Sequence, residues 1–311
     1  MKTSHFLLLL LLNVGWASVP SWATRLEGQL GVREFVFLRY GFALAGLLVI
    51  WPWLPGRMPR GRDFGRTVLM GVAVFTVGHL LQIGGIQGSE ASDASILLAL
   101  DPLVSSLGAA LFLHERIPGR RWIGFVLAIL GVALMSLWKR AAPLPGLLAN
   151  LLILLSFVSE AVWSVMGKPL IGRWGIPKVT GLALAAGTLA NGLLLLPDAG
   201  EHAAAFGRLS PEGWGVLAFF GVVLTAFGYS AWYLVIRDVP VSVASMTIYL
   251  QPIVGTGLAI LLTGAVLHPG HLWGGVAILA GLMAGIWRRG SRGPVAAGGE
   301  GEPEDRPPVP G

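Results

Sequence analysis

Long apolar runs alternate with short polar connections along almost the whole chain. Each run has roughly 17–23 residues, enough for one helix to cross the apolar core of a bilayer, about 30 Å thick. Most charged residues fall in the connections rather than in the runs. The pattern predicts an all-α polytopic membrane protein with ten transmembrane helices. The predicted spans lie near residues 5–22, 35–54, 68–87, 92–113, 120–138, 147–168, 179–196, 213–236, 241–263 and 272–288.

Composition agrees with this pattern and leaves little room for a soluble domain. Hydrophobic residues make up 54% of the chain and charged residues 12%, whereas soluble domains carry about 25% charged residues. Ten helices of about 20 residues use about 200 of the 311 residues. The sequence has no cysteine, which excludes disulfides, thiolate metal sites and cysteine nucleophiles. Residues 289–311 are rich in Gly, Pro and charge and predict a disordered cytosolic tail.

Basic residues in the connections predict the orientation in the membrane. If the N-terminus is cytoplasmic and the helices alternate, the cytoplasmic segments hold about three times as many Lys and Arg residues as the outer ones. This bias follows the positive-inside rule and predicts cytoplasmic N- and C-termini in an inner or plasma membrane. The net charge of +6 therefore reflects topology, and we expect no nucleic-acid partner. Lys139 and Arg140, on the outer side, are the exception.

The two halves of the chain resemble each other. A shift of 150 residues aligns residues 86–134 with 236–284 without a gap. Five helices in each half, an odd number, would give the halves opposite orientations, as in the inverted repeats of secondary transporters. The aligned identities include Pro102 with Pro252, Gly124 with Gly274, Gly131 with Gly281, and, upstream, Gly71 with Gly221 and Gly78 with Gly228. A shift shorter by three residues matches Trp16 with Trp163.

The repeat predicts how the chain is divided. We expect a first five-helix unit over residues 1–138, a linker over 139–146 and a second five-helix unit over 147–288. The start of the chain also imitates a cleavable secretory signal, with Lys2, a leucine run and a cleavage site near Thr24. Because the first unit needs this helix to match the second, we expect it to be retained.

The stretch ASDASILLALDPLVSSLGAALFLHERIPGRRWIGFVLAILGVAL has an Ala/Ser-rich helix start, Pro102 within the helix, Glu115 at its end, and Gly124 and Gly131 in the next helix. In these features the chain resembles EamA-type members of the drug/metabolite transporter superfamily over roughly residues 5–288. The resemblance implies ten helices in two five-helix repeats and export of small metabolites, with amino acids and related amphiphilic compounds foremost. The second half departs from the pattern at Ala265, which stands where the first half has Glu115.

Four ionisable residues fall within the predicted spans: Arg39, His79, Asp101 and Glu160. At 1.5 Å per residue, the last three lie within about 3 Å of the centre of three different helices. Ionisable groups are costly in lipid, so one shared polar cavity is the simplest explanation. We expect Asp101 and Glu160 to bind a substrate ammonium or exchange protons, either alone or as a carboxyl pair. Histidine titrates nearest neutrality, which makes His79 a third candidate.

Structural alternatives remain for each of these residues. A buried acid can be satisfied by a neighbouring hydroxyl or amide, and a buried histidine by a backbone carbonyl. Arg39 is a candidate for binding a substrate carboxylate or for gating, but it could also extend to the outer surface. Glu115 is expected to pair with an arginine or to cap a helix.

Neutral residues near the same depth complete the predicted site. We expect the cavity to be lined by Asn13, Trp16, Gln82, Trp163, Tyr249 and Gln251, with Tyr229, Trp232 and Tyr233 as further candidates. Gln251 is the repeat partner of Asp101. Pro102 and Pro252 remove a backbone donor and are candidate hinges, although both could be tolerated packing kinks. Membrane Trp and Tyr residues also often anchor at the interface rather than line a site.

The leading hypothesis is a secondary transporter that works by alternating access, with or without proton coupling. Import of a vitamin or nucleoside-like precursor and flipping of a lipid-like substrate remain alternatives. The spans contain no HExxH or GxSxG motif and the chain no Walker motif, so we expect neither an enzyme nor an ATP-driven pump. We expect no cofactor and no metal. The expected partners are a small-molecule substrate and the lipid bilayer, and a homodimer stays open.

Overall fold

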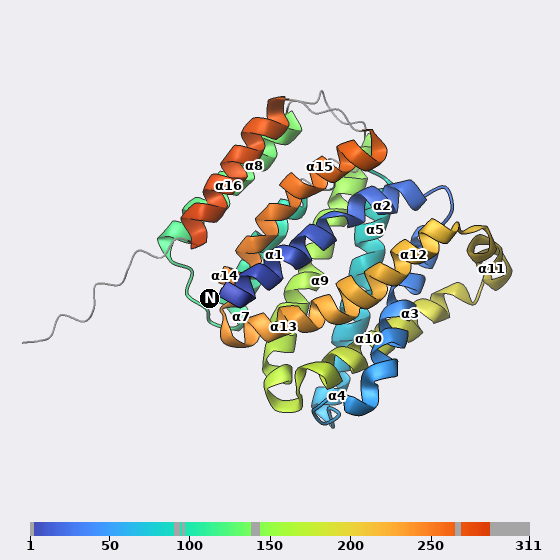
Figure 1. Cartoon of the computed structure of the whole chain (residues 1–311). Helices are drawn as coiled ribbons and strands as arrows, with labels where there is room; N and C mark the ends of the chain where they lie inside the picture. Colours follow the sequence, from blue (N-terminus) through green and yellow to red (C-terminus); the bar gives the residue numbers. More distant parts are fainter. Residues whose placement is uncertain (1–2, 90–93, 95–96, 138–143, 265–268, 287–311) are drawn as a thin grey trace, which may run out of the picture.

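The computed structural model describes residues 3–89, 94, 97–137, 144–264 and 269–286, and over these residues it contains helices and no strands (Figure 1). Seven helical segments are long and apolar enough to cross a membrane, which makes the chain a multi-pass membrane protein. They are Thr3–Leu26, Val32–Trp53, Arg62–Gln87, Leu148–Trp174, Ile176–Leu195, Pro211–Asp238 and Val241–Leu262. The other three predicted spans contain helices α7, α8 and α16, so the count of ten stays a prediction.

The first half begins with α1 (Thr3–Ala17) and α2 (Val19–Leu26), which together form one span. Pro20 lies in the first turn of α2, where a missing N–H breaks no helical hydrogen bond. The half continues with α3 (Val32–Ile50), η1 (Trp51–Trp53), α4 (Arg62–Val72), the π-helical turn η2 (Ala73–Gly78), α5 (His79–Gln87), η3 (Leu98–Leu100), α7 (Asp101–Phe112) and α8 (Gly119–Leu137).

The second half begins with the long helix α9 (Leu144–Trp174), which contains Pro169. It continues with α10 (Ile176–Leu195), α11 (Ala199–Arg208), α12 (Pro211–Phe219), the π-helical turn η4 (Phe220–Phe227), α13 (Gly228–Asp238), α14 (Val241–Ala244), η5 (Ser245–Leu250), α15 (Gln251–Thr263) and α16 (Pro269–Ile286). In both halves a π-helical turn precedes the helix that starts at His79 or Gly228. Such turns are rare and are frequent at functional sites.

Glycines allow helices of the two halves to approach closely. A Cβ on Gly71 of α4 would overlap the backbone of Ala183 of α10, and a Cβ on Gly221 of η4 would lie 2.5 Å from the carbonyl oxygen of Arg39. These two glycines are partners in the 150-residue shift. At these two contacts small residues let the helix backbones meet, as is common where helices pack within a membrane.

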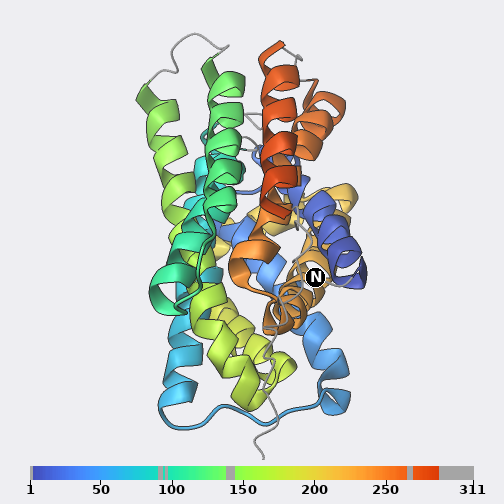
Figure 2. The ribbon, with the colours of Figure 1, turned by 90° about the vertical axis from the view of Figure 1, so that its left-hand side faces the viewer.

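Helices α8 and α16 lie side by side at one edge of the molecule (Figure 1, Figure 2). A Cβ on Gly131 of α8 would lie 2.6 Å from the carbonyl oxygen of Gly274, so these helices also meet backbone to backbone. Large apolar side chains cover much of the outer surface, as expected for contact with lipid rather than water. Examples are Val49, Leu69, Leu111, Leu189, Leu193 and Leu261.

Candidate functional site

A cavity of about 720 Å³, open space at its mouth included, lies between the two halves. Its walls come from α1, α2, α3 and α5, from α7 and α9, and from α13 and the junction of η5 with α15. All four ionisable residues that the sequence singles out line it: Arg39, His79, Asp101 and Glu160. The structure thus brings the four residues to one cavity, and their roles in binding a substrate or protons stay predictions.

The predicted neutral residues divide into two groups. Trp16, Gln82, Trp163 and Gln251 line the cavity. Asn13 is buried behind Gln251 and is not among the lining residues. Tyr249 is buried in a separate apolar cluster with Phe125, Met246 and Ile278, so its side chain faces away from the cavity. The i, i+2 spacing of Tyr249 and Gln251 places them on different faces of the helical segment.

Pro102 and Pro252 lie in the first turn of α7 and α15, each directly after a 3₁₀ turn. Pro252 lies near the middle of the apolar segment Val241–Leu262, as predicted, and the segment changes there from a 3₁₀ turn to an α-helix. At such a position the missing N–H breaks no α-helical hydrogen bond. The two prolines mark the same change of helix type in both halves, and their role as hinges stays a prediction.

Tyr229 connects Glu160 with His79 at the floor of the cavity. Its hydroxyl lies 3.0 Å from Glu160 Oε1 and 3.1 Å from His79 Nε2. His79 Nδ1 lies 2.8 Å from the carbonyl oxygen of Val74, in the π-helical turn η2. Because a carbonyl can only accept, Nδ1 carries the hydrogen, and Nε2 of the neutral ring is an acceptor. Tyr229 thus has one proton for two acceptors.

His79 and Tyr229 are themselves repeat partners, 150 residues apart, so this hydrogen bond joins equivalent positions of the two halves. Sequence reasoning included Tyr229 only among several aromatic candidates. Its aromatic character is common in membrane helices and gave no sign of a central position. The shift of 150 applied to His79 is the signal that could have found it.

Gln251 and Asn13 form a second polar pair, at the positions that the repeat relates to Asp101 and Glu160. Gln251 Nε2 donates to Asn13 Oδ1 at 2.7 Å, and Asn13 Nδ2 donates to Thr247 Oγ1 at 3.0 Å and to the carbonyl of Leu9 at 2.7 Å. Gln251 is the partner of Asp101 in the shift of 150, and Asn13 is the partner of Glu160 in the shift of 147 that also relates Trp16 to Trp163. At each of these two pairs of equivalent positions, one half therefore has a carboxyl group and the other half has an amide.

The two carboxyl groups have few donors of their own. Ser105 Oγ donates to Asp101 Oδ1 at 3.0 Å, and Tyr229 is the donor to Glu160. An amide pair can satisfy itself by one N–H···O bond, as Gln251 and Asn13 do. Two ionised carboxyl groups at one cavity repel each other, which favours binding of a proton or a cation at either of them. The arrangement is therefore suited to exchanging one for the other.

Arg39 is buried, with 3% of its surface exposed, so it does not extend to the outer surface. Its Nε donates to Thr225 Oγ1 at 3.0 Å, and its guanidinium carbon lies 5.6 Å from the ring centre of Tyr40 and 5.9 Å from that of Phe220. These contacts use one of its five donors and stabilise the cation through aromatic faces. The remaining donors are suited to a ligand anion at the cavity wall.

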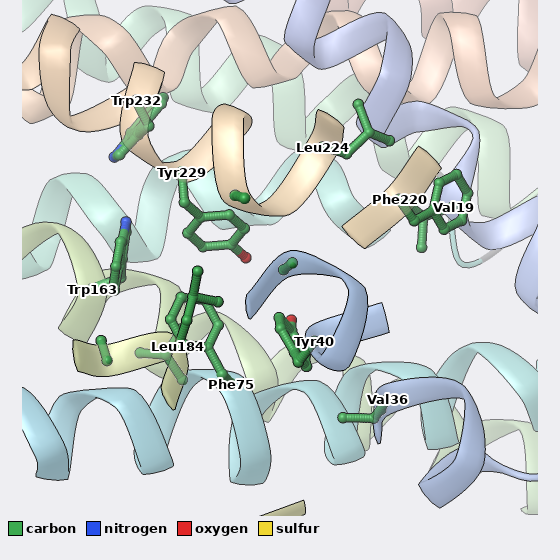
Figure 3. Close-up of a cluster of buried hydrophobic side chains, with 14 of the residues drawn as sticks. Val19, Val36, Tyr40, Phe75, Trp163, Leu184, Phe220, Leu224, Tyr229 and Trp232 are labelled. Carbon is green, nitrogen blue, oxygen red and sulfur yellow. The ribbon is translucent and has the colours of Figure 1, made fainter. Parts of the chain in front are cut away.

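Aromatic rings form the rest of the wall. Figure 3 shows Trp163 and Phe75 around the ring of Tyr229, and the ring centres lie 5.3 Å and 5.2 Å from it. Trp16 approaches the same ring from α1, with centres 6.1 Å apart. The indole nitrogen of Trp232 donates to Ser164 Oγ, whereas that of Trp163 is buried without a partner among the described residues. The wall is thus apolar with few, fixed polar groups.

The described residues contain no cluster of three or more His, Cys, Asp or Glu side chains that could hold a metal ion. The cavity presents two carboxyl groups, one imidazole, one guanidinium, two side-chain amides, two serine hydroxyls, and the hydroxyl and indole groups of Tyr and Trp residues.

Comparison with known proteins identifies the family of this chain. The model of the EamA-like transporter family matches residues 3–137 and residues 147–285. The chain belongs to the EamA-like transporter family. The two matches together span most of the sequence, and this resemblance agrees with the one that the first-half stretch suggested.

Relatives of this EamA-like protein are named as transporters. A probable terminal-alkyne amino-acid exporter of Streptantibioticus cattleyicolor is 29% identical over 88% of this chain and 91% of its own length. The uncharacterized transporter YdfC of Bacillus subtilis is 28% identical over 90% of each chain. One solved crystal structure superposes with a TM-score of 0.70 over 91% of this chain and 96% of its own, at 14% identity, which supports the fold alone.

Proposed function

We propose that this EamA-like transporter exports small metabolites, amino acids and related amphiphilic compounds foremost, across the inner or plasma membrane. The observation that carries the proposal is one cavity between the halves, lined by two partly exposed carboxyl groups, a buried arginine and several aromatic rings. An enclosed site of this composition accepts a molecule that bears both a cation and an anion beside an apolar part.

The positions of the charged groups suggest how such a substrate binds. Its ammonium group binds between Asp101 and Glu160, and its carboxylate binds the donors of Arg39 that Thr225 does not use. Its apolar part packs on Trp16, Trp163 and neighbouring rings. The relative named as an amino-acid exporter supports this class of substrate.

Transport requires the cavity to open alternately to either side. We infer that two five-helix units of opposite orientation, residues 1–138 and 147–288, rock against each other around the cavity. Two features support this: the family model matches both units, and the close approaches at Gly71 and Gly221 occur at repeat-equivalent positions. The distribution of Lys and Arg supports cytoplasmic termini.

Proton exchange provides the driving force in this proposal. When Glu160 is ionised, the Tyr229 hydroxyl donates a hydrogen bond to it, and the carboxylate can bind the substrate ammonium. When Glu160 is protonated, it no longer attracts the ammonium, and Tyr229 is free to donate to His79 Nε2. Substrate and proton then compete for the same carboxyl group, which couples their movements.

The test is reconstitution in lipid vesicles with a panel of labelled amino acids, with and without a pH gradient. Asp101→Asn and Glu160→Gln should each abolish gradient-driven flux of amino acids. The matched control is Glu201→Gln, on the exposed face of α11, which should transport like the wild type. Proton dependence that survives both cavity changes would refute the coupling. Preferential transport of a nucleoside, a vitamin precursor or a lipid would replace the proposed substrate class.

A further inference from the structure

The carboxyl group of Glu115 binds several parts of the chain outside the cavity. Glu115 lies in the connection between α7 and α8, and 12% of its side chain is exposed. Lys168 Nζ of α9 lies 2.9 Å from Oε1. The backbone N–H groups of Val241 and Ser242, where α14 begins, donate to Oε1 at 3.1 Å and to Oε2 at 3.3 Å, and Ser242 Oγ donates to Oε2 at 3.1 Å.

Arg121 adds a further connection. This residue of α8 is buried, and its Nη1 donates to the hydroxyl of Ser242. The Glu115 cluster (Glu115, Arg121, Lys168, Val241 and Ser242) therefore joins one connection of the first half to two elements of the second half. Burial raises the pKa of the Glu115 carboxyl, but the hydrogen bonds from Lys168, Val241 and Ser242 outweigh burial, and the net shift is downward. The carboxylate form is thus favoured by its partners.

The cluster lies at the end of α7 that does not line the cavity. Asp101 starts α7 and lines the cavity, whereas Glu115 follows the far end of this helix, about 18 Å away at 1.5 Å per residue. The cavity extends the other way, to Pro20 of α2 and Ile86 near the end of α5. In Figure 1, α14 and α7 lie beside the N-terminus, away from α2.

The geometry points to a role for this cluster: we propose that Glu115 is the latch that holds the cavity closed on its own side of the membrane. The latch ties α7, which carries Asp101, to the start of the segment α14–α15, which carries Gln251. These two segments must separate at this end before a substrate can leave there. The inference rests on the proposed alternating access.

The physical chemistry of the latch suits a reversible contact. Charge-assisted hydrogen bonds are stronger than neutral ones, yet the side chain of Lys168 is 26% exposed, so water can replace the broken bonds. The equivalent position of the second half in the 150-residue shift is Ala265, which lies outside the described residues and has no carboxyl group. The second half therefore has no carboxyl group at the position equivalent to Glu115, and we expect the latch to favour the conformation closed on the Glu115 side.

Cysteine accessibility tests the latch without any knowledge of the substrate. The natural chain has no cysteine, so Ala109→Cys gives a single reporter. Ala109 is fully buried on α7, between Asp101 and Glu115. A membrane-impermeant maleimide is added to oriented vesicles from either side. Glu115→Gln should raise the rate of labelling from the Glu115 side about tenfold or more, because the charge-assisted bonds that oppose opening are weakened.

The chain offers a matched control. The side chain of Glu34, near the start of α3, is also 12% exposed and bonds to His202 at 2.7 Å, but it lies at the opposite end of the molecule. Glu34→Gln should leave labelling from the Glu115 side unchanged. Ser242→Ala, a milder change that removes only the hydroxyl contacts, should give an intermediate increase.

The outcomes separate the latch from the proposed transport function. Faster labelling from the Glu115 side alone supports the latch, whatever substrate is carried. Unchanged labelling in a folded Glu115→Gln variant would overturn it, and so would an equal increase from both sides, which indicates general loosening. Failure of amino-acid flux in the vesicle assay refutes the substrate class and leaves the accessibility result standing.

Discussion

Tyr229 has one hydroxyl hydrogen and two neighbouring acceptors, Glu160 and His79, so it can donate a hydrogen bond to one of them at a time. The hydroxyl bridges Glu160 and His79, and the far side of the imidazole is held by Val74. The carbonyl of Val74 keeps the hydrogen on Nδ1 of the neutral imidazole, so the hydroxyl of Tyr229 is the member of this chain that can change its acceptor. At the scale of the residue, the proposed transport therefore depends on where one proton lies.

Replacing Tyr229 by phenylalanine tests this dependence. Tyr229→Phe keeps the ring contacts with Trp163 and Phe75 but removes the bridge. Gradient-driven flux in vesicles should fall at least about tenfold, because a hydrogen bond to a charged group is lost. Tyr233→Phe is the matched control, since its hydroxyl donates to the carbonyl of Trp163 outside this chain of bonds. Equal flux in the two variants would argue against the role of Tyr229.

A second prediction concerns Glu115 and pH. Its pKa is lowered in the folded protein, so the ionised carboxyl stabilises the fold above the ordinary pKa of glutamate, and this contribution disappears as the pH falls through the lowered value. The melting temperature of the wild type in detergent should exceed that of Glu115→Gln near pH 7 and approach it at acid pH. A difference that stays constant across this range would contradict the prediction.

The sequence predicted that the ionisable residues within the spans would line one cavity, but not which side chains they would contact. Arg39, His79, Asp101 and Glu160 could be assigned to one cavity because an ionisable group in lipid is costly unless it faces a polar space. The burial of Arg39 among aromatic rings and the position of Tyr249 in a separate cluster depend on tertiary packing. A one-dimensional hydropathy pattern holds no information on which face of a helix meets which neighbour.

At the scale of the helix, the α-helical hydrogen-bonding pattern is interrupted at equivalent places in the two halves. The π-helical turns η2 and η4 precede His79 and Gly228, and 3₁₀ turns precede Pro102 and Pro252. The repeat in the sequence predicted matched prolines and glycines but not these changes of helix type. Each break lies next to a residue that lines the cavity, which places the polar groups at their present depth.

The close approach at Gly71 gives a prediction about helix packing. Gly71→Ala should destabilise the protein by about 1–3 kcal/mol, because the added methyl group overlaps the backbone of Ala183 and forces α4 and α10 apart. Gly65→Ala, on the same helix with open space around its Cβ, should be neutral or stabilise by up to about 1 kcal/mol through helix propensity. Unfolding midpoints in a defined detergent compare the two, and equal midpoints would contradict the packing argument.

At the scale of the whole molecule, the number of spans decides whether the halves are inverted. Seven helical segments satisfy the length and hydropathy of a span, and the regions of α7, α8 and α16 would supply the remaining three. An even total puts both termini on one side of the membrane, and five spans in each half put the linker between them on the other. The topology therefore tests the repeat and the orientation together.

Single cysteines in the cysteine-free chain can measure this topology. Ser4→Cys and Ser291→Cys should react with an impermeant maleimide only from the cytoplasmic side, because both termini follow the positive-inside rule. Ala141→Cys, in the predicted linker, should react only from the outer side. Termini on opposite sides would exclude ten spans, and a cytoplasmic linker would exclude five spans in the first half. Either result would also remove the basis for Asp101–Gln251 and His79–Tyr229 as equivalent pairs of an inverted repeat.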